Sequence, residues 1–503
     1  MRNYGGWICF ASLVLGGCVT RSTDVVTSNY DEKGAPSTSS SSKVGAVHAQ
    51  SVAKNAATLG PASIRLAGFP AAPASGSMNW SATHGGAGDD VAFAVAADDA
   101  SDAIVAGAIE GDVDLGCGMH STASRAGFVA QYAPDGTCTW AVYFDGADDA
   151  SASAVAFDSV THDVYVTGIF DESVSIGGNV VQSAGGYDAF VARVSGGVVT
   201  WSTTFGGASD EYVYALAVDG THVGVGGAFY DRSSFGGESS ATSQGDADAF
   251  VATYLESSGD YAASWTAGGT SWDAVNALAA SSTGFVAAGT FADGVDFGRG
   301  VVQSAGGQDA FLVSLDSNLA ATSSRVIAGA GDDSLAGVFV DASGNVTTSG
   351  YFQGAASVGA ADPVTADGDV AGLVATYDSS LTYIRSSTFA ASGEAVVQAL
   401  AADPSTGGFL LAGRFSGTAS VANADYASDE NAESGFVLAY APDGSVTWGG
   451  VLGSGQAAEG LSIAVSPSGH VVAVGDFETS VDFGDGPVAS AGQGDVFVLS
   501  LHE

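Results

Sequence analysis

An internal repeat is the sequence feature that most constrains the fold. A Gly-x-Phe triplet begins at residues 168, 227, 289, 350, 413 and 475, and Gly107-Ala108-Ile109 supplies a seventh copy with Ile in place of Phe. Successive copies start 59 to 63 residues apart, as the steps from 168 to 227 and from 350 to 413 show. Repeats of this length that contain only short apolar runs are typical of propellers and other repeat architectures.

Two further markers accompany this triplet in a fixed order. One is a Phe-Val-Ala-like triplet, preceded two residues earlier by an aspartate in four copies: Asp188, Asp248, Asp309 and Asp495. The other is a tryptophan, present at residues 80, 140, 201, 265 and 448 and replaced in two copies near Arg325 and Ser386. Three markers in one order indicate that the repeats are structural units.

Each repeat reads as four short strands, which in the third copy are 201–205, 212–218, 222–227 and 250–254. A single four-stranded sheet cannot shield both faces from water, whereas sheets packed around an axis bury each other. The sequence therefore predicts an all-β fold, a seven-bladed β-propeller with four-stranded blades over residues 80–503. A linear β-solenoid is the alternative, although its coils are usually shorter and need caps.

The two ends of the repeat region predict how the ring closes. The last copy ends with an apolar strand at 497–501 and has no tryptophan strand after it. The first tryptophan strand, 80–84, has no earlier strand with which to pair. We therefore expect these two strands to pair, so that the N-terminal strand completes the C-terminal blade.

The repeats resemble the bacterial β-propeller repeat family known as SBBP. The residues that carry this resemblance are Trp201-Ser202-Thr203-Thr204-Phe205-Gly206-Gly207 and Gly245-Asp246-Ala247-Asp248-Ala249-Phe250. The resemblance extends over essentially all of residues 80–503. It implies a propeller fold and says almost nothing about activity.

The N-terminus resembles that of a bacterial lipoprotein. A basic start and a short apolar run, Trp7 to Leu15, are typical of a secretory signal, and the run is too short to span a bilayer. Leu15-Gly16-Gly17-Cys18 resembles a lipobox, so we predict a signal peptide at 1–17 and lipidation of Cys18. An ordinary signal peptide with an incidental cysteine is the alternative. Residues 18–79, rich in Ser, Thr and Ala, are predicted to be a disordered, flexible linker.

The lipid anchor predicts the location of the protein and its first partner, the membrane. Because Val19 rather than an aspartate follows Cys18, we expect an outer-membrane lipoprotein whose head faces the periplasm or the cell surface. The formal net charge is -42, and the chain beyond Trp80 has seven arginines and no lysine. Such a surface repels phosphate backbones, so nucleic-acid binding is excluded.

Pairs of acidic residues follow the glycine-rich turn in several repeats: Asp89-Asp90, Asp148-Asp149, Asp210-Glu211 and Asp332-Asp333. Acidic turns can supply the oxygen ligands of calcium, but aspartates in turns more often accept hydrogen bonds from backbone N–H groups. No EF-hand loop or zinc spacing is present. We therefore favour structural turns, predict no metal site and no cofactor, and leave calcium open as a partner.

Cys117 and Cys138 are the cysteines that remain after Cys18, and export permits a disulfide between them. A reactive pair or a metal site with the nearby His120 is the alternative. His84 occupies the place that Phe144 and Phe205 hold in other repeats, so we interpret it as a repeat variant.

No catalytic motif stands in a suitable context, and we predict no catalytic residues. The favoured function is a binding or scaffold module that recognises a protein or glycan on one propeller face. A hydrolase or lyase with a site in the channel, and a purely structural envelope protein, are the alternatives. An enzyme should break the repeat symmetry with several polar residues on one face.

Overall fold

The computed structural model describes residues 64–67, 78–421, 424–428, 433–452, 458–482 and 487–502. Cys18 and the predicted signal peptide lie outside these residues. Ala62–Glu503 form one compact unit, and all of its described elements are strands. Within the described ranges, no helix is present that is long and apolar enough to cross a membrane.

The strands pair in antiparallel sets of four. In three sets, which we call the first, second and third sheets, the strands are in order β3 (Val91–Ala97), β4 (Ala103–Ile109), β7 (Ala126–Tyr132) and β8 (Cys138–Asp145); β9 (Ala150–Asp158), β10 (Asp163–Phe170), β13 (Asp188–Ser195) and β14 (Val198–Gly207); and β15 (Glu211–Val218), β16 (His222–Phe229), β19 (Asp248–Leu255) and β20 (Tyr261–Ala267).

The later sets follow the same order. They consist of β21 (Ala274–Ser281), β22 (Gly284–Asp296), β23 (Val301–Asp316) and β24 (Ala321–Gly329); β25 (Asp333–Val340), β26 (Val346–Ser357), β27 (Val364–Tyr377) and β28 (Tyr383–Phe389); β29 (Ala395–Ala402), β30 (Phe409–Ser416), β33 (Glu433–Tyr440) and β34 (Val446–Leu452); and β35 (Ala458–Val465), β36 (Val471–Phe477), β39 (Asp495–Leu501) and β2 (Met78–His84).

Small two-stranded hairpins connect the second and third strands of most sets. They are β5 (Asp112–Asp114) with β6 (Met119–Ser121), β11 (Ser173–Ile176) with β12 (Asn179–Gln182), β17 (Arg232–Ser234) with β18 (Ala241–Thr242), β31 (Thr418–Val421) with β32 (Ala424–Ala427), and β37 (Ser480–Asp482) with β38 (Val488–Ala489). Elsewhere the long strands β22, β23, β26 and β27 extend to include the same hairpin.

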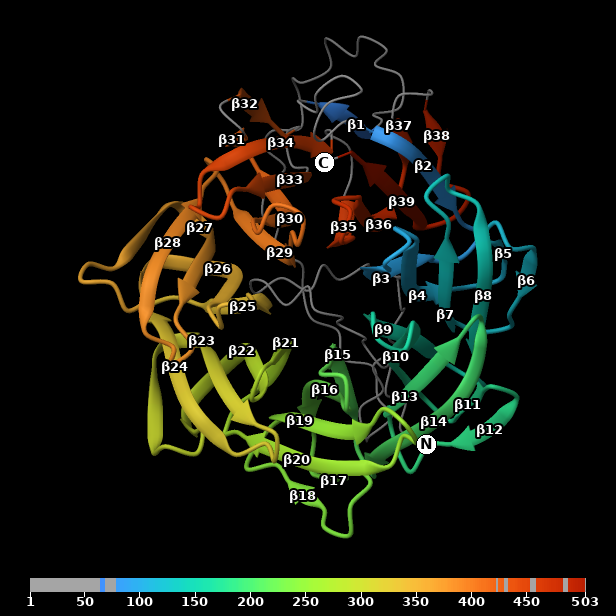
Figure 1. The fold of residues 1–503 in the computed structure, drawn as a ribbon, viewed down its shortest axis with the longest axis horizontal. Coiled ribbons are helices and arrows are strands. Elements are labelled where there is room, and N and C mark those ends of the chain that lie inside the picture. Colours follow the sequence, from blue (N-terminus) through green and yellow to red (C-terminus); the bar gives the residue numbers. More distant parts are fainter. Residues whose placement is uncertain are drawn as a thin grey trace, which may run out of the picture. The chain divides into compact units, whose positions relative to one another are not determined.

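The sets follow one another around a central axis, as Figure 1 shows. The first strand of each set contacts the first strand of the next, in the cycle β3, β9, β15, β21, β25, β29, β35 and back to β3. Strand β2 pairs with β39 in the register Trp80↔Ser500 and His84↔Val496, so the N-terminal strand completes the C-terminal sheet. Radial antiparallel sheets closed in this way form a β-propeller.

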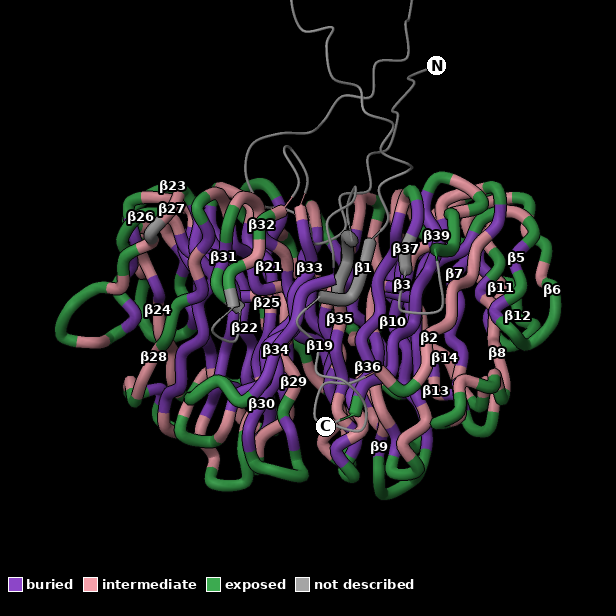
Figure 2. The backbone as a smooth tube through the Cα atoms, turned by 90° about the horizontal axis from the view of Figure 1, so that it is seen from above, coloured by how far each residue is buried: buried purple, intermediate pink, exposed green. Residues whose placement is uncertain are grey.

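The core lies between neighbouring sheets, because successive residues of a strand point to opposite faces. On β4, Ile104 and Ala106 pack toward the second sheet, whereas Val105 packs with Val472 and Val474 of β36. Every residue of β4 is therefore buried, which explains why this strand reads as a continuous apolar run. Figure 2 shows buried residues concentrated in the strands and exposed residues in the loops at both faces.

Two details differ from the sequence analysis in how strands are assigned. The tryptophan strand, expected to be the first of each repeat, is the outermost strand of the preceding sheet, as β14 is in the second sheet. Ile64–Ala67, inside the predicted linker, forms strand β1, which pairs antiparallel with β34 and parallel with β37. An outermost strand such as β34 has unpaired backbone groups at its edge, and these accept an additional strand.

The interpretation of Trp265 as a repeat marker is wrong. Trp80, Trp140, Trp201 and Trp448 each pair with the third residue after the Phe of the neighbouring strand. Trp265 pairs instead with Val251, the residue directly after Phe250, and Ala263 holds the marker position. Its spacing from the glycine-rich turn is shorter by two residues, which the strand register reveals.

Candidate functional site

The predicted disulfide is present between Cys117 and Cys138, and it joins the start of β8 to the loop between β5 and β6. His120 does not accompany it as a metal ligand, because its ring stacks on Tyr143 and hydrogen-bonds Asp145 at 2.8 Å. His84 stands where Phe144 and Phe205 stand in other sheets, as predicted, and it stacks on Tyr132.

Most of the predicted acidic pairs place one carboxylate at the start of the first strand of a sheet. Asp90, Glu211 and Asp333 occupy this position, and Asp273, which the sequence analysis missed, does too. Asp149 does not, since Ala150 holds the position there. These acids accept hydrogen bonds from the glycine-rich turn, for example from the Gly86 N–H to Asp90 at 2.6 Å and from the Gly269 N–H to Asp273 at 2.8 Å.

The aspartates that precede the Phe markers lie on the third strand and complete these sites. Asp188, Asp248 and Asp495 begin their strands, whereas Asp309 lies inside the long strand β23. Asp188 accepts the N–H of Ala184 at 2.7 Å and Asp495 that of Ala491 at 2.9 Å. Each of the four faces the first-strand acid of the next sheet, in the pairs Asp188 with Glu211, Asp248 with Asp273, Asp309 with Asp333, and Asp495 with Asp90. A Cβ on Gly206 would lie 2.3 Å from Asp188 Oδ1 and 2.5 Å from Glu211 Oε2, so both carboxylates converge there.

At each junction between neighbouring sheets, the two paired positions are either both acidic or both uncharged. At the remaining three junctions both equivalent positions are uncharged: Ala126 with Ala150, Ala371 with Ala395, and Ser434 with Ala458. Either both partners are acidic or neither is. This pattern indicates that the two carboxyls of a junction act as one unit.

Burial dominates the electrostatics of these pairs. It raises the pKa values of the carboxyls to about 6 for Asp90, Asp188 and Asp248, about 7 for Asp273, and about 8 for Glu211 and Asp333. Two carboxyls in one buried place favour a state in which they share a proton. Within the described ranges, no group of three or more acidic, histidine or cysteine side chains is placed to hold a metal ion.

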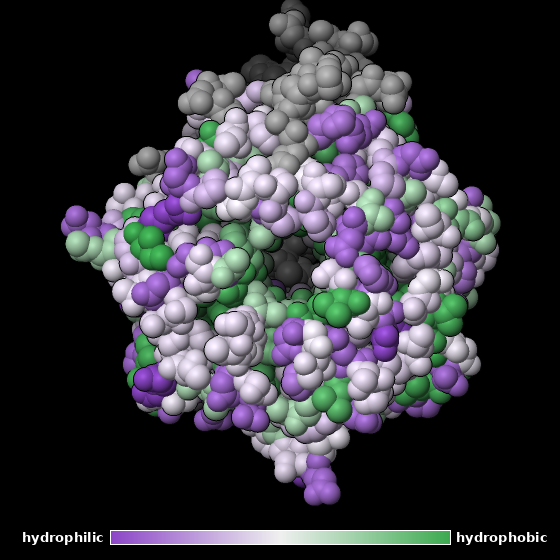
Figure 3. All heavy atoms as spheres, in the orientation of Figure 1, coloured by the Kyte–Doolittle hydropathy of each residue, from purple (hydrophilic) through white to green (hydrophobic). Residues whose placement is uncertain are grey.

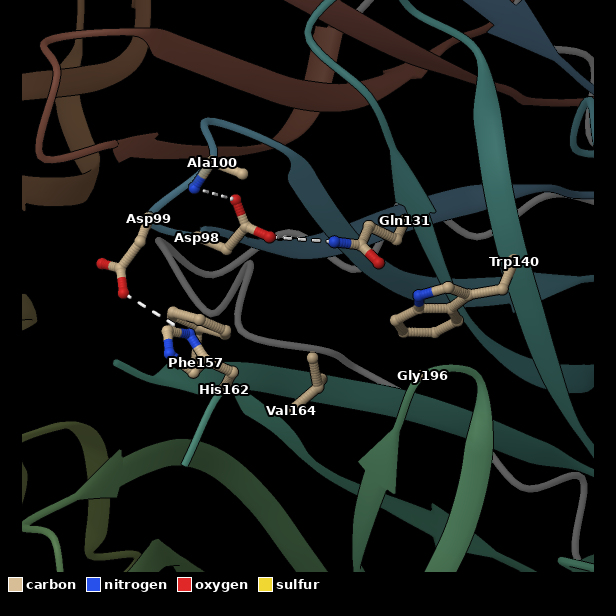
Figure 4. A pocket seen from close by; sticks show the side chains of 9 residues that line it. All are labelled: Asp98, Asp99, Ala100, Gln131, Trp140, Phe157, His162, Val164 and Gly196. Carbon is tan, nitrogen blue, oxygen red and sulfur yellow. Dashed lines mark hydrogen bonds and ion pairs between the residues drawn. The ribbon is translucent and has the colours of Figure 1, made fainter. Parts of the chain in front are cut away.

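A hollow of about 380 Å³ lies at the junction of the first and second sheets, and Figure 4 shows it from close by. We call it the junction pocket. The first sheet contributes the loop after β3, Gln131 of β7 and Trp140 of β8; the second contributes side chains of β9 and β10 and the β13–β14 turn. Its lining residues are Asp98, Asp99, Ala100, Gln131, Trp140, Phe157, His162, Val164 and Gly196.

A short hairpin leaves this pocket open. Strands β13 and β14 are joined by only two residues, Gly196-Gly197, both with positive φ, as two-residue hairpin turns require. Strands β19 and β20 of the third sheet are joined by five residues, 256–260. There the Glu256 carbonyl accepts a hydrogen bond from the indole N–H of Trp201 at 2.9 Å. Trp140 is the equivalent of Trp201, and among the described residues its indole N–H has no acceptor.

The polar wall of the junction pocket is acidic. Gln131 donates from one amide nitrogen to Asp98 at 2.9 Å and to Asp102 at 2.8 Å. His162 lies 3.6 Å from Asp99 and is largely exposed. Burial raises the pKa of Asp102, and the negative charges of Asp98 and Asp135 add to this shift. The pocket therefore combines an aromatic surface, an indole N–H donor and carboxylates, and its lining contains no arginine or lysine.

The equivalent place at the junction of the second and third sheets carries a cation. Arg193 holds the position of Gln131 and forms an ion pair with Asp163, which is the equivalent of Asp102. Burial alone would raise the pKa of Asp163, but hydrogen bonds led by that from Arg193 lower it overall. The junction pocket was not predicted from the sequence, although the shortened turn is visible once Ser195-Gly196-Gly197-Val198 is aligned with 255–261.

The comparisons with known proteins add little beyond this geometry. A scan of family models finds no match, and a search of curated protein sequences finds none either. Three similar solved structures are the Neurospora crassa Pan2 WD40 domain (10% identity, 82% of this chain and 89% of that one, TM-score 0.40), Kuenenia stuttgartiensis hydrazine synthase (10%, 76% and 92%, 0.38), and the quinohemoprotein alcohol dehydrogenase of Comamonas testosteroni (12%, 84% and 76%, 0.37). TM-scores this low carry over neither a fold nor an activity.

Proposed function

We propose that this chain is a secreted, lipid-anchored lipoprotein whose head is a seven-bladed β-propeller that acts as a binding module. The cycle of first strands and the pairing of β2 with β39 support seven blades. The resemblance to SBBP repeats supports the propeller fold. An experimental structure with another number of sheets in the ring would contradict this count.

The junction pocket is the proposed ligand site, and the hollow that the two-residue β13–β14 turn leaves beside Trp140 is the observation that carries this proposal. At the neighbouring junction the protein's own chain supplies both the acceptor and the cation. At the junction pocket neither is supplied, and the hollow is open to an outside ligand. Aromatic and polar groups that converge in a hollow are typical of ligand sites.

The lining chemistry supports binding rather than catalysis. The potential nucleophiles in the lining are the carboxylates of Asp98 and Asp99 and the imidazole of His162. Asp98 already accepts hydrogen bonds from the backbone N–H groups of Ala100 and Asp102, and Asp99 lies beside His162. His162 and Asp99 are both substantially exposed, and exposure to water weakens the electrostatic effects that acid–base catalysis needs. A hydrolase or lyase with a site elsewhere, in the central hollow visible in Figure 3, is the alternative, as is a purely structural envelope protein.

A hairpin graft tests the binding proposal. In this variant Gly196-Gly197 is replaced by the five residues of 256–260, which fill the equivalent place in the third sheet. The control makes the same replacement at Gly177-Gly178, the two-residue turn of the outer hairpin β11–β12. Labelled full chain carrying C18S is applied to peptide and glycan arrays. We expect binding that the graft abolishes and the control retains; arrays that bind nothing, or bind both variants equally, would contradict the proposal.

The anchor is tested separately. The segment Leu15–Cys18 predicts that Cys18 is acylated and holds the head at the outer membrane through the linker. Metabolic labelling with palmitate should mark the protein, and Cys18→Ser should abolish the label and release the protein from the membrane fraction. Labelling that persists in C18S would exclude Cys18 as the anchor.

A further inference from the structure

The junction pocket lacks two groups that its sister junction contains, and the pair of missing groups points to the class of ligand. The sister junction holds a guanidinium, that of Arg193, against the carboxylate of Asp163. It also holds a peptide carbonyl, that of Glu256, against the indole N–H of Trp201. Both groups approach one small volume, because Arg193 also reaches the Glu256 carbonyl at 3.5 Å.

The junction pocket has the same tryptophan indole and aspartate carboxylate, but it lacks the guanidinium and the peptide carbonyl that contact them in the sister junction. Trp140 and Asp102 stand at the positions of Trp201 and Asp163. Gln131 replaces the arginine, and the two-residue turn removes the carbonyl. The carboxylates that line the pocket are those of Asp98 and Asp99; Gln131 donates to Asp98 and to Asp102, which is not among the lining residues, and His162 lies 3.6 Å from Asp99. The acid-rich surface around these carboxylates attracts cations.

The apolar lining suits the stem of a long basic side chain. Phe157 and Val164 form one wall and the Trp140 ring another, as Figure 4 shows. Long basic side chains bury their methylene stems against such surfaces while the charged head reaches polar groups. A guanidinium also stacks favourably on tryptophan and donates in a planar fork that matches carboxylates.

We propose that the junction pocket binds an arginine side chain of a partner peptide, with the guanidinium toward Asp98 and Asp99 and a peptide carbonyl accepting from the Trp140 indole N–H. This inference rests on the proposed function and deepens it by naming the ligand class. A neutral sugar would also meet the indole N–H and the aromatic surface, but it would leave the carboxylates without a cation. The sister junction shows that this scaffold balances the equivalent aspartate with a guanidinium.

Nuclear magnetic resonance of the tryptophan side chains tests the ligand class. The full chain carrying C18S is labelled with ¹⁵N-tryptophan, and the Trp140 indole signal is assigned with W140F. Three probes are titrated separately: acetyl-Gly-Arg-Gly-amide, the same peptide with neutral citrulline in place of arginine, and N-acetylglucosamine. We expect the arginine peptide to shift the Trp140 signal saturably and the citrulline peptide to bind at least about tenfold more weakly, because a charge-assisted hydrogen bond is lost.

A variant that supplies the missing cation from within sharpens the test. Gln131→Arg should pair with Asp102 as Arg193 pairs with Asp163, and should weaken the arginine peptide at least about tenfold. Gln182→Arg adds the same charge on the exposed strand β12 and should leave binding unchanged.

The outcomes separate this inference from the proposed function. Equal binding of the arginine and citrulline peptides, or a response to N-acetylglucosamine alone, overturns the arginine inference while the pocket remains a ligand site. A Trp140 signal that no probe moves overturns the arginine inference as well, and the arrays with the hairpin graft then decide whether the pocket binds another class.

Discussion

The junction pocket and the junction between the second and third sheets are built from the same repeat and differ in two features. Both have a tryptophan on the outermost strand and an aspartate at the start of the second strand. One has Gln131 and a two-residue turn; the other has Arg193 and a five-residue turn. Because turns lie at the surface and tolerate changes of length, a difference of three residues (5 − 2) converts a filled interface into a pocket without disturbing the sheets.

The comparison also shows what the acidic pairs do. They stand at the loop ends of four junctions, and the junction pocket is not among these four, since Ala126 and Ala150 are its equivalent residues. The carboxyls accept backbone N–H groups and face one another, so they join sheets. Scaffold and candidate site therefore use acidic residues differently. The scaffold acids are buried and face one another, whereas at the pocket the buried Asp98 accepts from Gln131 and the more exposed Asp99 lies 3.6 Å from His162.

The largest expected effect concerns the strand that carries Trp140. The disulfide fixes the start of β8, whereas β14, which carries Trp201, has none. Closing a loop of this length stabilises a fold by about 3 kcal/mol, so the double variant C117S/C138S should lose about that much stability. Thermal unfolding checks it, with unfolding under a reducing agent as the matched measurement. An unchanged melting temperature would show that the strand needs no such constraint.

The next largest effect on stability is expected from removing the guanidinium of Arg193. Arg193→Gln makes the sister junction resemble the pocket in charge but leaves Asp163, which is almost fully buried, without its ion pair. A buried charge that loses its partner destabilises strongly, and partial exposure of Arg193 reduces the effect to about 2 kcal/mol. Gln131→Arg should change stability far less. Equal effects of the two variants on unfolding would contradict the proposed equivalence of the junctions.

A smaller difference separates the two tryptophans. Trp201→Phe keeps most of the ring and loses the hydrogen bond to the Glu256 carbonyl, so it should destabilise the fold by about 1 kcal/mol. Trp140→Phe loses no such bond in the free protein and should be nearly neutral. Chemical unfolding of both variants measures the difference. A larger cost for Trp140→Phe would mean that its indole N–H is already satisfied.

The acidic pairs predict how stability changes with pH. Their pKa values are raised on folding, for Glu211 and Asp333 to about 8, so the folded state holds extra protons. The stabilisation is fully present below the unfolded pKa, about 4, and is lost as the pH rises through the folded pKa. The melting temperature should therefore fall from about pH 5 to 8, and Glu211→Gln should flatten the slope. Asp246→Asn removes the same charge at an exposed position and should leave the slope of melting temperature against pH unchanged. Equal slopes in the wild type and in E211Q would contradict the proposal that the paired carboxyls share protons.

The sequence was sufficient for the repeating scaffold because its signals are local. Alternating and continuous apolar runs, the glycine-rich turns and the phenylalanine markers each follow from strand geometry within one repeat. Closure by 80–84 followed from counting unpaired strands. Trp265 was misassigned because the sequence reveals a tryptophan but not its register. Strand β1 was missed because its partners are distant in the sequence: Leu66 pairs with Leu452 of β34 and Ile64 with Val481 of β37.

The candidate site was harder to predict because it results from the absence, at one junction, of the five-residue turn and the arginine that the next junction contains. Asp98, Gln131, Trp140 and His162 belong to two repeats and form no motif along the chain. The acidic residues of the junction pairs, such as Asp188 and Glu211, were visible in the sequence as separate markers, but only the fold shows that they face each other. Comparing equivalent positions of neighbouring repeats is the operation that would have found both.

The most direct test of the account is to titrate acetyl-Gly-Arg-Gly-amide into the hairpin graft and into its Gly177-Gly178 control while observing the indole signals. If the short β13–β14 turn creates a ligand site, the peptide shifts the Trp140 signal in the control as in the wild type and binds the graft at least about tenfold more weakly. The same dissociation constant in all three proteins would contradict the claim that this turn opens the site.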